Sequence, residues 1–356
     1  MVTPQPVLAP PSKAAVFMVA TVNAGGEPAV RELLDGLTGL VRSVAFREPE
    51  ARLSCVVGIG AEVWGRLFDG PAPRELHPFV PLEGVRHRAP ATPGDLLFHV
   101  RALRMDLCFE LARLIVLELG GAVTVVDEVH GFRYFDNRDL LGFVDGNENP
   151  EGGAAAEAVF VGEEDPAFLG GSYVIVQKYL HRMAAWQELS VEEQERVIGR
   201  GKADNLEMPD DVKPANSHVA LNTITDEDGN ERQIVRANLP FGSIGDGEFG
   251  TYFIGYARTP AVTELMLSRM FIGDPPGNTD RILDFSTAVT GCLFYVPSAD
   301  FLDDLPGPPA AATATEPATE PATATEPAAG PEPAPAPVTV RAGRGGSLGI
   351  GSMKGA

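Results

Sequence analysis

Cysteines, basic residues and long apolar runs are all scarce in this chain. Among its 356 residues the only cysteines are Cys55, Cys108 and Cys292, and none forms a CxxC pair. This argues against a disulfide framework and a zinc ribbon, excludes the CxxCH motif of covalent haem attachment, and favours a reducing, cytoplasmic compartment. No run approaches the roughly 18 apolar residues of a membrane span. The N-terminus "MVTPQPVLAPPSK" has neither the charged start nor the apolar core of a signal peptide.

The charge balance is strongly acidic. The 28 Lys and Arg residues against 49 Asp and Glu give a formal net charge of −21. Such a chain repels nucleic-acid phosphates and anionic lipid, so we expect neither nucleic acid nor membrane as a partner. Apolar residues make up 44% of the sequence, enough for a sizeable core, and the length suggests two domains.

Apolar periodicity predicts the order β-α-β-β-α-β in the first part of the chain, and roughly the same order with an extra strand in the second. For the first set we expect strands at 14–23, 53–64, 95–103 and 122–135, with helices at 27–46 and 104–119. For the second set we expect strands at 170–181, 217–225, 232–240, 250–258 and 286–298, with helices at 191–199 and 260–271. This repeat predicts an α+β fold of two tandem ferredoxin-like halves, with antiparallel sheets and peripheral helices.

The domain limits follow from changes in composition. A loose Pro-rich leader is expected at 1–13, before the two halves at 14–145 and 146–305. The boundary between the halves lies in a stretch rich in Gly, Asn and Asp. From 306 to 346 the chain is dominated by Pro, Ala, Thr and Glu, and such a segment is expected to form a disordered, extended linker. A short segment with an apolar pattern, 347–356, ends the chain.

Three stretches of the second half carry chemically capable side chains: "GFVDGNENP", "ANSHVALN" and "QIVRANLPFG". Alternation along a strand puts Arg236 and Asn238 on one face. Each residue taken alone has an ordinary structural explanation. Arg236 suits an edge strand with its head in water, a lone His218 is more often structural than a ligand, and Asp145 suits a turn or helix cap.

Together, the three stretches resemble the dye-decolourising peroxidase family, in particular its B class. Gly142 to Gly146 match its GxxDG motif, His218 its proximal histidine, and Arg236 and Asn238 its distal pair. The resemblance covers about 14–305 and implies two ferredoxin-like halves of the dimeric α/β-barrel type. It also implies one non-covalent haem b per chain, hydrogen peroxide and an organic reductant as substrates, a ferryl intermediate, and a homo-oligomer.

The resemblance assigns roles to particular residues. His218 would be the axial ligand of the haem iron, and Asp280 or Asp284 would accept from its other ring nitrogen, with Asp280 preferred. Asp145 would move the peroxide proton, while Arg236 would stabilise developing charge. Asn238 is expected to orient peroxide or water.

Arg200 matches a family arginine near the haem. It would pair with a haem propionate, or else lie as a helix C-terminal cation on a solvated face.

Several further residues have open interpretations. Glu148, Glu207 and Glu231 could gather at the haem edge around a divalent cation such as manganese, or be ordinary solvated carboxylates. Trp64 and Trp186 could relay electrons or simply fill the core. For the whole chain, the alternative to a peroxidase is a haem-binding or haem-handling protein with incidental peroxidase activity.

The C-terminal segment "GSLGIGSMKGA" resembles the cargo-loading peptide of proteins packaged in encapsulin shells. The resemblance implies that Leu348, Ile350 and Met353 enter pockets on the shell protein, with the linker as a tether. It places the protein in the cytoplasm, inside an encapsulin nanocompartment. The alternative is a frayed terminus with no function.

Overall fold

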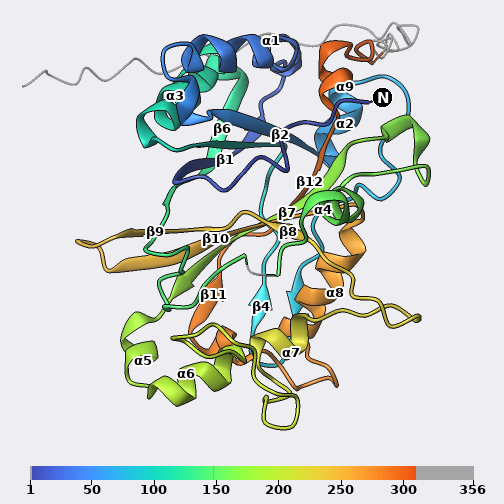
Figure 1. Ribbon diagram of the computed structural model, residues 1–356. Helices are drawn as coiled ribbons and strands as arrows, with labels where there is room; N and C mark the ends of the chain where they lie inside the picture. The colour runs from blue at the N-terminus through green and yellow to red at the C-terminus, as the bar shows by residue number, and fades with distance from the viewer. Residues whose placement is uncertain (1, 147, 310–356) are drawn as a thin grey trace, which may run out of the picture. The chain divides into compact units, whose positions relative to one another are not determined.

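A computed structural model describes residues 2–146 and 148–309 (Figure 1). The expected targeting peptide at 347–356 and nearly all of the expected linker lie outside the described residues. Among residues 2–146 and 148–309, no helix is long and apolar enough to cross a membrane.

The first set of elements agrees closely with the predicted order. It comprises β1 (Ala14–Val22), α1 (Glu27–Ala45), η1 (Pro49–Ala51), β2 (Ser54–Gly60), α2 (Ala61–Leu67), β3 (Leu82–Glu83), β4 (Arg88–Ala89), β5 (Leu96–Ala102), α3 (Met105–Leu119), η2 (Gly120–Ala122) and β6 (Val123–Phe132). The strand expected at 53–64 is shorter than predicted, because its second half turns at Gly60 into α2, whose apolar residues bury against β2 and β12.

The second set departs further from expectation. It comprises α4 (Gly152–Val159), η3 (Pro166–Phe168), β7 (Ser172–His181), α5 (Met183–Gln187), α6 (Val191–Ile198), α7 (His218–Asn222), β8 (Val235–Arg236), β9 (Leu239–Ser243), β10 (Glu248–Ala257), α8 (Pro260–Phe271), η4 (Arg281–Asp284), β11 (Ser286–Ala288), β12 (Cys292–Val296) and α9 (Ala299–Asp303). The strand expected at 232–240 is split between β8 and β9, and the one at 286–298 between β11 and β12.

The strand predicted at 217–225 is wrong, because His218–Asn222 is a helix. The Ser217 side chain accepts from the Ala220 backbone N–H and so caps the first turn of α7. The alternation of "SHVAL" fits a half-buried strand equally well, so a run this short does not separate the two states.

Strand order is the same in both halves. The main sheet runs β6-β1-β5-β2-β12-β7-β10-β8, with β9 on β10 and β11 on β7, and every pairing is antiparallel. Each half thus orders its four main strands as fourth, first, third and second, the ferredoxin-like arrangement. The halves join where β2 pairs with β12 at Ile59 and Gly60. The α+β architecture with antiparallel strands is therefore confirmed, although the described strands do not pair into a closed barrel.

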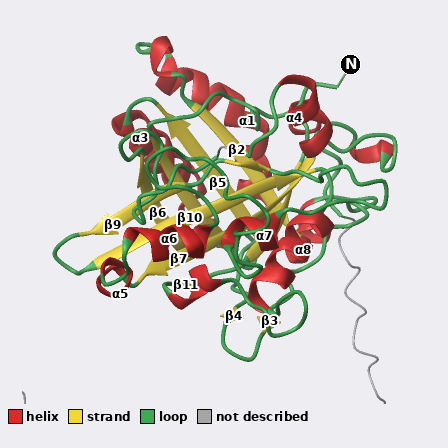
Figure 2. Cartoon of the chain, turned by 60° about the horizontal axis from the view of Figure 1, so that its bottom comes forward, coloured by secondary structure: helices red, strands yellow, loops and turns green. Residues whose placement is uncertain are grey.

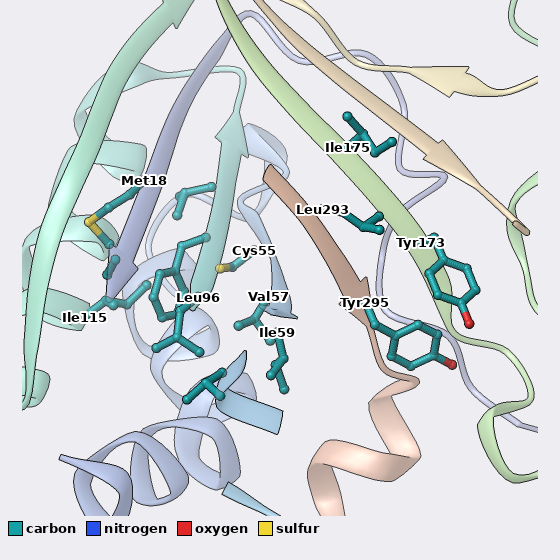
Figure 3. Close-up of a cluster of buried hydrophobic side chains, with 14 of the residues drawn as sticks. Met18, Cys55, Val57, Ile59, Leu96, Ile115, Tyr173, Ile175, Leu293 and Tyr295 are labelled. Atoms are coloured by element: carbon teal, nitrogen blue, oxygen red, sulfur yellow. The ribbon is translucent and has the colours of Figure 1, made fainter. Parts of the chain in front are cut away.

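The largest apolar cluster lies on one face of the sheet and includes residues of helices α1, α2, α3 and α8. Figure 3 shows Met18, Leu96 and Ile115 meeting on the N-terminal side, with Tyr173 and Tyr295 on β7 and β12. A second cluster fills the opposite face of the sheet, between strands of the two halves. Helix α8 packs against β7 and β10, α7 packs against α8, and α6 packs against α7 (Figure 2), and the site described below is formed here.

The N-terminal leader is not loose. Gln5 is buried, and its Nε2 donates to the carbonyls of Val57 (3.0 Å) and Pro297 (2.9 Å), while its Oε1 accepts from the Val57 N–H (2.9 Å). The buried Arg101 guanidinium also donates to the carbonyls of Pro6 and Val7. Hydrogen bonds with Val57, Pro297 and Arg101 thus satisfy polar groups of the leader and fix its path.

Candidate active site

His218 is held by a buried carboxylate. Its Nδ1 is 2.7 Å from Oδ2 of Asp280, a residue that is fully buried. Asp280 is fixed in turn, because its Oδ1 accepts from the Ile282 N–H (2.9 Å) at the start of η4 and its own N–H donates to the Met270 carbonyl. Since a carboxylate only accepts, Nδ1 carries the proton and the lone pair lies on Nε2. The imidazole is thus oriented to offer Nε2 as a ligand.

Asp284 does not contact His218. It pairs with Arg86 (2.6 Å) and with His87 (3.3 Å) of the segment between β3 and β4. Of the two carboxylates considered from sequence, the structure therefore brings only Asp280 to the histidine. Asn222, one turn after His218, donates to the His218 carbonyl (2.8 Å) and reaches Asp280 Oδ2 at 3.4 Å.

Asp145 and Asn238, which line a cavity together with His218, are hydrogen-bonded to each other. Asn238 Nδ2 donates to Asp145 Oδ2 (3.0 Å), and Asn238 Oδ1 accepts from the Ile254 N–H (2.9 Å) on β10. The GxxDG turn needs its glycines, because Gly142 and Gly146 have φ of +95° and +80°. Asn238 is therefore fixed by the sheet and in turn fixes the carboxylate.

Arg236 is placed by a residue that the sequence analysis did not single out. Asn149 Nδ2 donates to the Arg236 carbonyl (2.7 Å), and the Arg236 N–H donates to Asn149 Oδ1 (2.9 Å). Asn149 belongs to the same "GFVDGNENP" stretch as Asp145, and its position there was the available signal. The buried Nε of Arg236 has no hydrogen-bond partner among the described residues. A donor buried this way implies an acceptor that the polypeptide does not supply.

These groups share one cavity between β10, α7, α8 and the GxxDG turn. Its wall includes His218, Asp145, Arg236, Asn238 and Arg200, and it encloses about 1090 Å³ of space free of protein atoms, some of it open to solvent. The remaining wall is largely apolar, with Ile198, Ile234, Phe253, Met266, Leu267 and Met270 among its residues. Asp280 lies behind His218, outside the lining.

Arg200 reaches the cavity but is bound to carboxylates. It contacts Glu148 closely, lies 3.3 Å from Glu207 Oε2, and donates to the Asn205 carbonyl. Glu231 instead bridges to Thr225 and accepts from Gln233. The described residues contain no group of three or more His, Cys, Asp or Glu suited to a metal ion. The three glutamates considered from sequence thus do not form a metal-ligand cluster.

The two tryptophans are core residues. Both are 2% exposed. Trp64 packs among Phe68, Phe168 and Tyr295. Trp186 donates from Nε1 to the Leu141 carbonyl (2.9 Å), directly beside the GxxDG turn. Trp186 therefore supports the loop that carries Asp145.

Two titratable residues of the cavity wall were missed by the sequence analysis. Burial raises the pKa of the Asp139 carboxyl to about 7, and the charge of Asp145 adds to the rise although the Phe143 N–H opposes it. Burial also lowers the pKa of His181 to about 4, and its two nitrogens are hydrogen-bonded to Ser286 and Thr251. His181 therefore stays neutral at pH 7.

The lowered pKa of His181 predicts how the free energy of unfolding depends on pH. Its folded pKa of about 4 lies below the ordinary value of 6.5, so the unfolded chain takes up a proton first as the pH falls. The free energy of unfolding should decline between pH 6.5 and about 4, with at most about 3 kcal/mol from this group. Thermal unfolding across this range should show a shallower decline in His181→Gln than in the unaltered protein. Equal slopes would contradict the assignment.

Comparison with known proteins agrees with this geometry. Residues 4–133 match the family model "Dyp-type peroxidase, N-terminal", and residues 136–301 match "Dyp-type peroxidase, C-terminal". The chain belongs to the Dyp-type peroxidase family. It is 65% identical over 314 residues to a dye-decolorizing peroxidase of Mycobacterium tuberculosis, covering 88% of this chain and 94% of that one. A dye-decolorizing peroxidase of Mycolicibacterium paratuberculosis is 61% identical over 354 residues, covering 99% and 93%.

Solved structures of family members resemble the fold. The encapsulated DyP-type peroxidase from Mycobacterium smegmatis matches with a TM-score of 0.86 and 65% identity, covering 87% of this chain and all of that one. DypB from Rhodococcus jostii RHA1 matches with a TM-score of 0.83 and 61% identity, covering 85% and 97%. The family resemblance drawn from the three motifs is thereby confirmed.

Proposed function

We propose that this Dyp-type peroxidase binds one haem b non-covalently and uses hydrogen peroxide to oxidise dyes, phenols or other organic donors. The observation that carries the proposal is the placement of His218, backed by Asp280, in the same cavity as Asp145, Asn238 and Arg236. Solved variants of DypB from Rhodococcus jostii RHA1 are described as complexes with heme. The reaction consumes one peroxide and two donor hydrogen atoms and yields two waters and two oxidised donors.

The residues present fit a haem. The cavity has apolar walls, an imidazole at His218 whose Nε2 is free to ligate, and a buried Arg236 Nε without a partner among the described residues. His218 would hold the iron through Nε2, and the Asp280 hydrogen bond would make the imidazole a more basic ligand. Arg200, which contacts Glu148 and Glu207 in the structure, would exchange one of these carboxylates for a haem propionate. When bound, haem would store the two oxidising equivalents that peroxide supplies.

The distal residues would move the proton. Asp145 would take a proton from peroxide and pass it to the far oxygen, so that this oxygen would leave as water. Asn238 holds Asp145 Oδ2 and so directs the other carboxylate oxygen. Arg236 stabilises negative charge that develops on the peroxide as the O–O bond breaks. A haem-handling protein needs no such acid–base arrangement, which favours the enzyme over that alternative.

An absorption spectrum of the purified protein before and after peroxide tests the proposal. A Soret band that shifts within one turnover, and returns on adding an organic donor, is the expected result. A Soret band that does not change when peroxide is added would favour the alternative, a haem-handling protein.

The hydrogen bond that His218 donates to Asp280 leads to a separate prediction. Asp280→Asn should lower haem affinity by roughly 10–100-fold and raise the reduction potential of the haem iron, because the imidazole becomes a weaker donor. Potentiometric titration and haem transfer measure the two effects. Asp284→Asn, four residues later on η4, is the matched control and should change neither. Equal shifts in both variants would count against a specific role for Asp280.

We also propose that the protein is encapsulin cargo and acts in the cytoplasm, inside the shell. The support is the resemblance of 347–356 to a cargo-loading peptide and the solved structure of an encapsulated relative from Mycobacterium smegmatis. Leu348, Ile350 and Met353 would occupy pockets on the shell protein, and 306–346 would act as the tether. The body is proposed to be a homo-oligomer, so that several weak tails add avidity.

Removing residues 347–356 should abolish packaging and leave peroxidase activity unchanged. Co-expression with the shell protein, followed by shell purification and a haem assay, measures the packaged fraction. Leu348→Ser with Ile350→Ser is a finer variant that keeps the chain length. Packaging of the truncated protein at the level of the full chain would refute the assignment.

A further inference from the structure

A second cavity lies on the other face of β10. Thr251 and Phe253 line the haem cavity, whereas Tyr252, between them on the strand, lines a separate cavity of about 130 Å³. This space lies between β6 and β1 of the first half and β7, β10 and β12 of the second. Because about 10–15 Å³ suffices for one water, the cavity has room for a small organic molecule.

Two polar atoms in this cavity have no partner. Tyr252 is fully buried, and neither its hydroxyl nor Asp127 Oδ2 has a hydrogen-bond partner among the described residues. The other polar groups are satisfied, since the Cys292 thiol donates to the Thr92 carbonyl (3.3 Å) and the Thr290 hydroxyl accepts from the Lys178 N–H (2.8 Å). Unpaired buried polar groups are costly, so these two atoms imply a ligand.

Asp127 is turned into the cavity by an irregularity in the sheet. The register of β6 on β1 shifts between Val19 and Ala20, which pair with Asp127 and Val125. Val125 therefore packs with the cluster under the helices, while Val129, beyond the bulge, joins the cluster between the halves. β-Bulges commonly re-aim a side chain in this way. In a regular strand with no register shift, Asp127 would share the face of Val125 and point toward the helices.

The charge around Asp127 favours a cation. Burial raises the pKa of its carboxyl, the charge of Lys178 opposes the rise, and the charge of Glu248 adds to it to a smaller extent. Among the described residues Lys178 makes no hydrogen bond or ion pair to Asp127; its Nζ lies 3.7 Å from Glu248 Oε1 and 5.0 Å from the Phe241 ring centre. A carboxylate oxygen can only accept a hydrogen bond, and the neighbouring Tyr252 hydroxyl can accept one as well. A ligand that contacts both must therefore donate hydrogen bonds. Val19, Val126, Val176 and Pro93 give the rest of the wall an apolar character.

We propose that this cavity binds a small protonated primary amine, with Asp127 as its counter-ion and Tyr252 as its second polar contact. The ammonium head satisfies both unpaired atoms, and the short aliphatic body fills the space between the valines. The site is separate from the peroxidase chemistry and does not depend on it.

Saturation-transfer NMR on the full-length, haem-loaded protein tests the site, with ethylammonium as the probe. Ethylammonium should bind, while ethanol (no charge), acetate (opposite charge) and tetramethylammonium (no N–H donor) should not. Asp127→Asn should weaken binding by roughly 10–100-fold and Tyr252→Phe by roughly 2–10-fold. Glu128→Gln removes the same charge from the exposed face of the same strand and should leave binding unchanged.

Thermal unfolding of each isosteric variant serves as the check that the variant is folded. Equal binding of tetramethylammonium would mean general attraction to an acidic surface, and equal binding of ethanol would mean that the charge is irrelevant. Either result, or ethylammonium binding that survives Asp127→Asn, overturns the proposal. So does the absence of ethylammonium binding to the unaltered protein, which would mean that water alone occupies the cavity.

Discussion

His218→Ala is expected to abolish stable haem binding. His218 is the residue of the cavity whose ring is oriented by a buried carboxylate, with Nδ1 2.7 Å from Asp280 and Nε2 left to ligate. Its loss removes the proposed protein–iron bond and leaves Asp280 buried with a weaker partner, the Asn222 amide at 3.4 Å. The ratio of Soret to protein absorbance after purification measures the effect, and it should fall to near zero.

A control variant at a different histidine and a rescue experiment make this test specific. His130→Ala changes a surface histidine paired with Glu128 and should retain haem fully. His218→Gly with added imidazole should recover a Soret band, because the small ligand can occupy the vacated position. Full haem retention with an unchanged spectrum in His218→Ala would rule out the ligand assignment.

Asp145→Asn should retain haem but slow the peroxide reaction by about 10²–10⁴-fold, the usual contribution of a positioned acid–base group. The amide keeps an oxygen that can accept from Asn238 but cannot take up the peroxide proton. Stopped-flow absorption with excess peroxide measures the rate. Asp136→Asn removes an exposed carboxylate from the same loop and should leave the rate unchanged.

Arg236→Leu should slow the same step by roughly 10²–10³-fold through loss of charge stabilisation. Arg232→Leu, four residues earlier and exposed, is its control. The relative size of the Asp145 and Arg236 effects shows whether proton transfer or charge stabilisation limits the step. If neither variant slows the reaction, the proposed distal roles are wrong.

The sequence correctly predicted the helices and strands that are encoded by the pattern of neighbouring apolar residues. Helix α1 was expected because Val30, Leu33, Leu34 and Leu37 recur at helical spacing, and these residues are buried in the structure. The strands β1, β5 and β7 were expected because their runs are apolar and of strand length. Local patterns failed where a segment was short, as at α7, or where one apolar run contained two elements, as at β2 and α2.

The candidate site was found from sequence only through its three motifs taken together. Asp145, His218, Arg236 and Asn238 each had an ordinary explanation alone, and it is the structure that places them around one cavity. For Asn149 the only sequence signal was its place in the same stretch as Asp145, and for Asp139 and His181 there was none, because the significance of these residues lies in what they face.

By itself, the sequence determined the family, the α+β class with its repeated β-α-β-β-α-β order, and the acidic, cysteine-poor character, since these depend on composition and neighbouring residues. Only the tertiary structure decided which of two carboxylates meets His218, that Asn238 holds Asp145, and that a bulge turns Asp127 into a second cavity. The histidine pair spans 62 residues and the Asn238–Asp145 pair 93. Contacts at such separations are set by sheet register and helix packing, which no local pattern encodes.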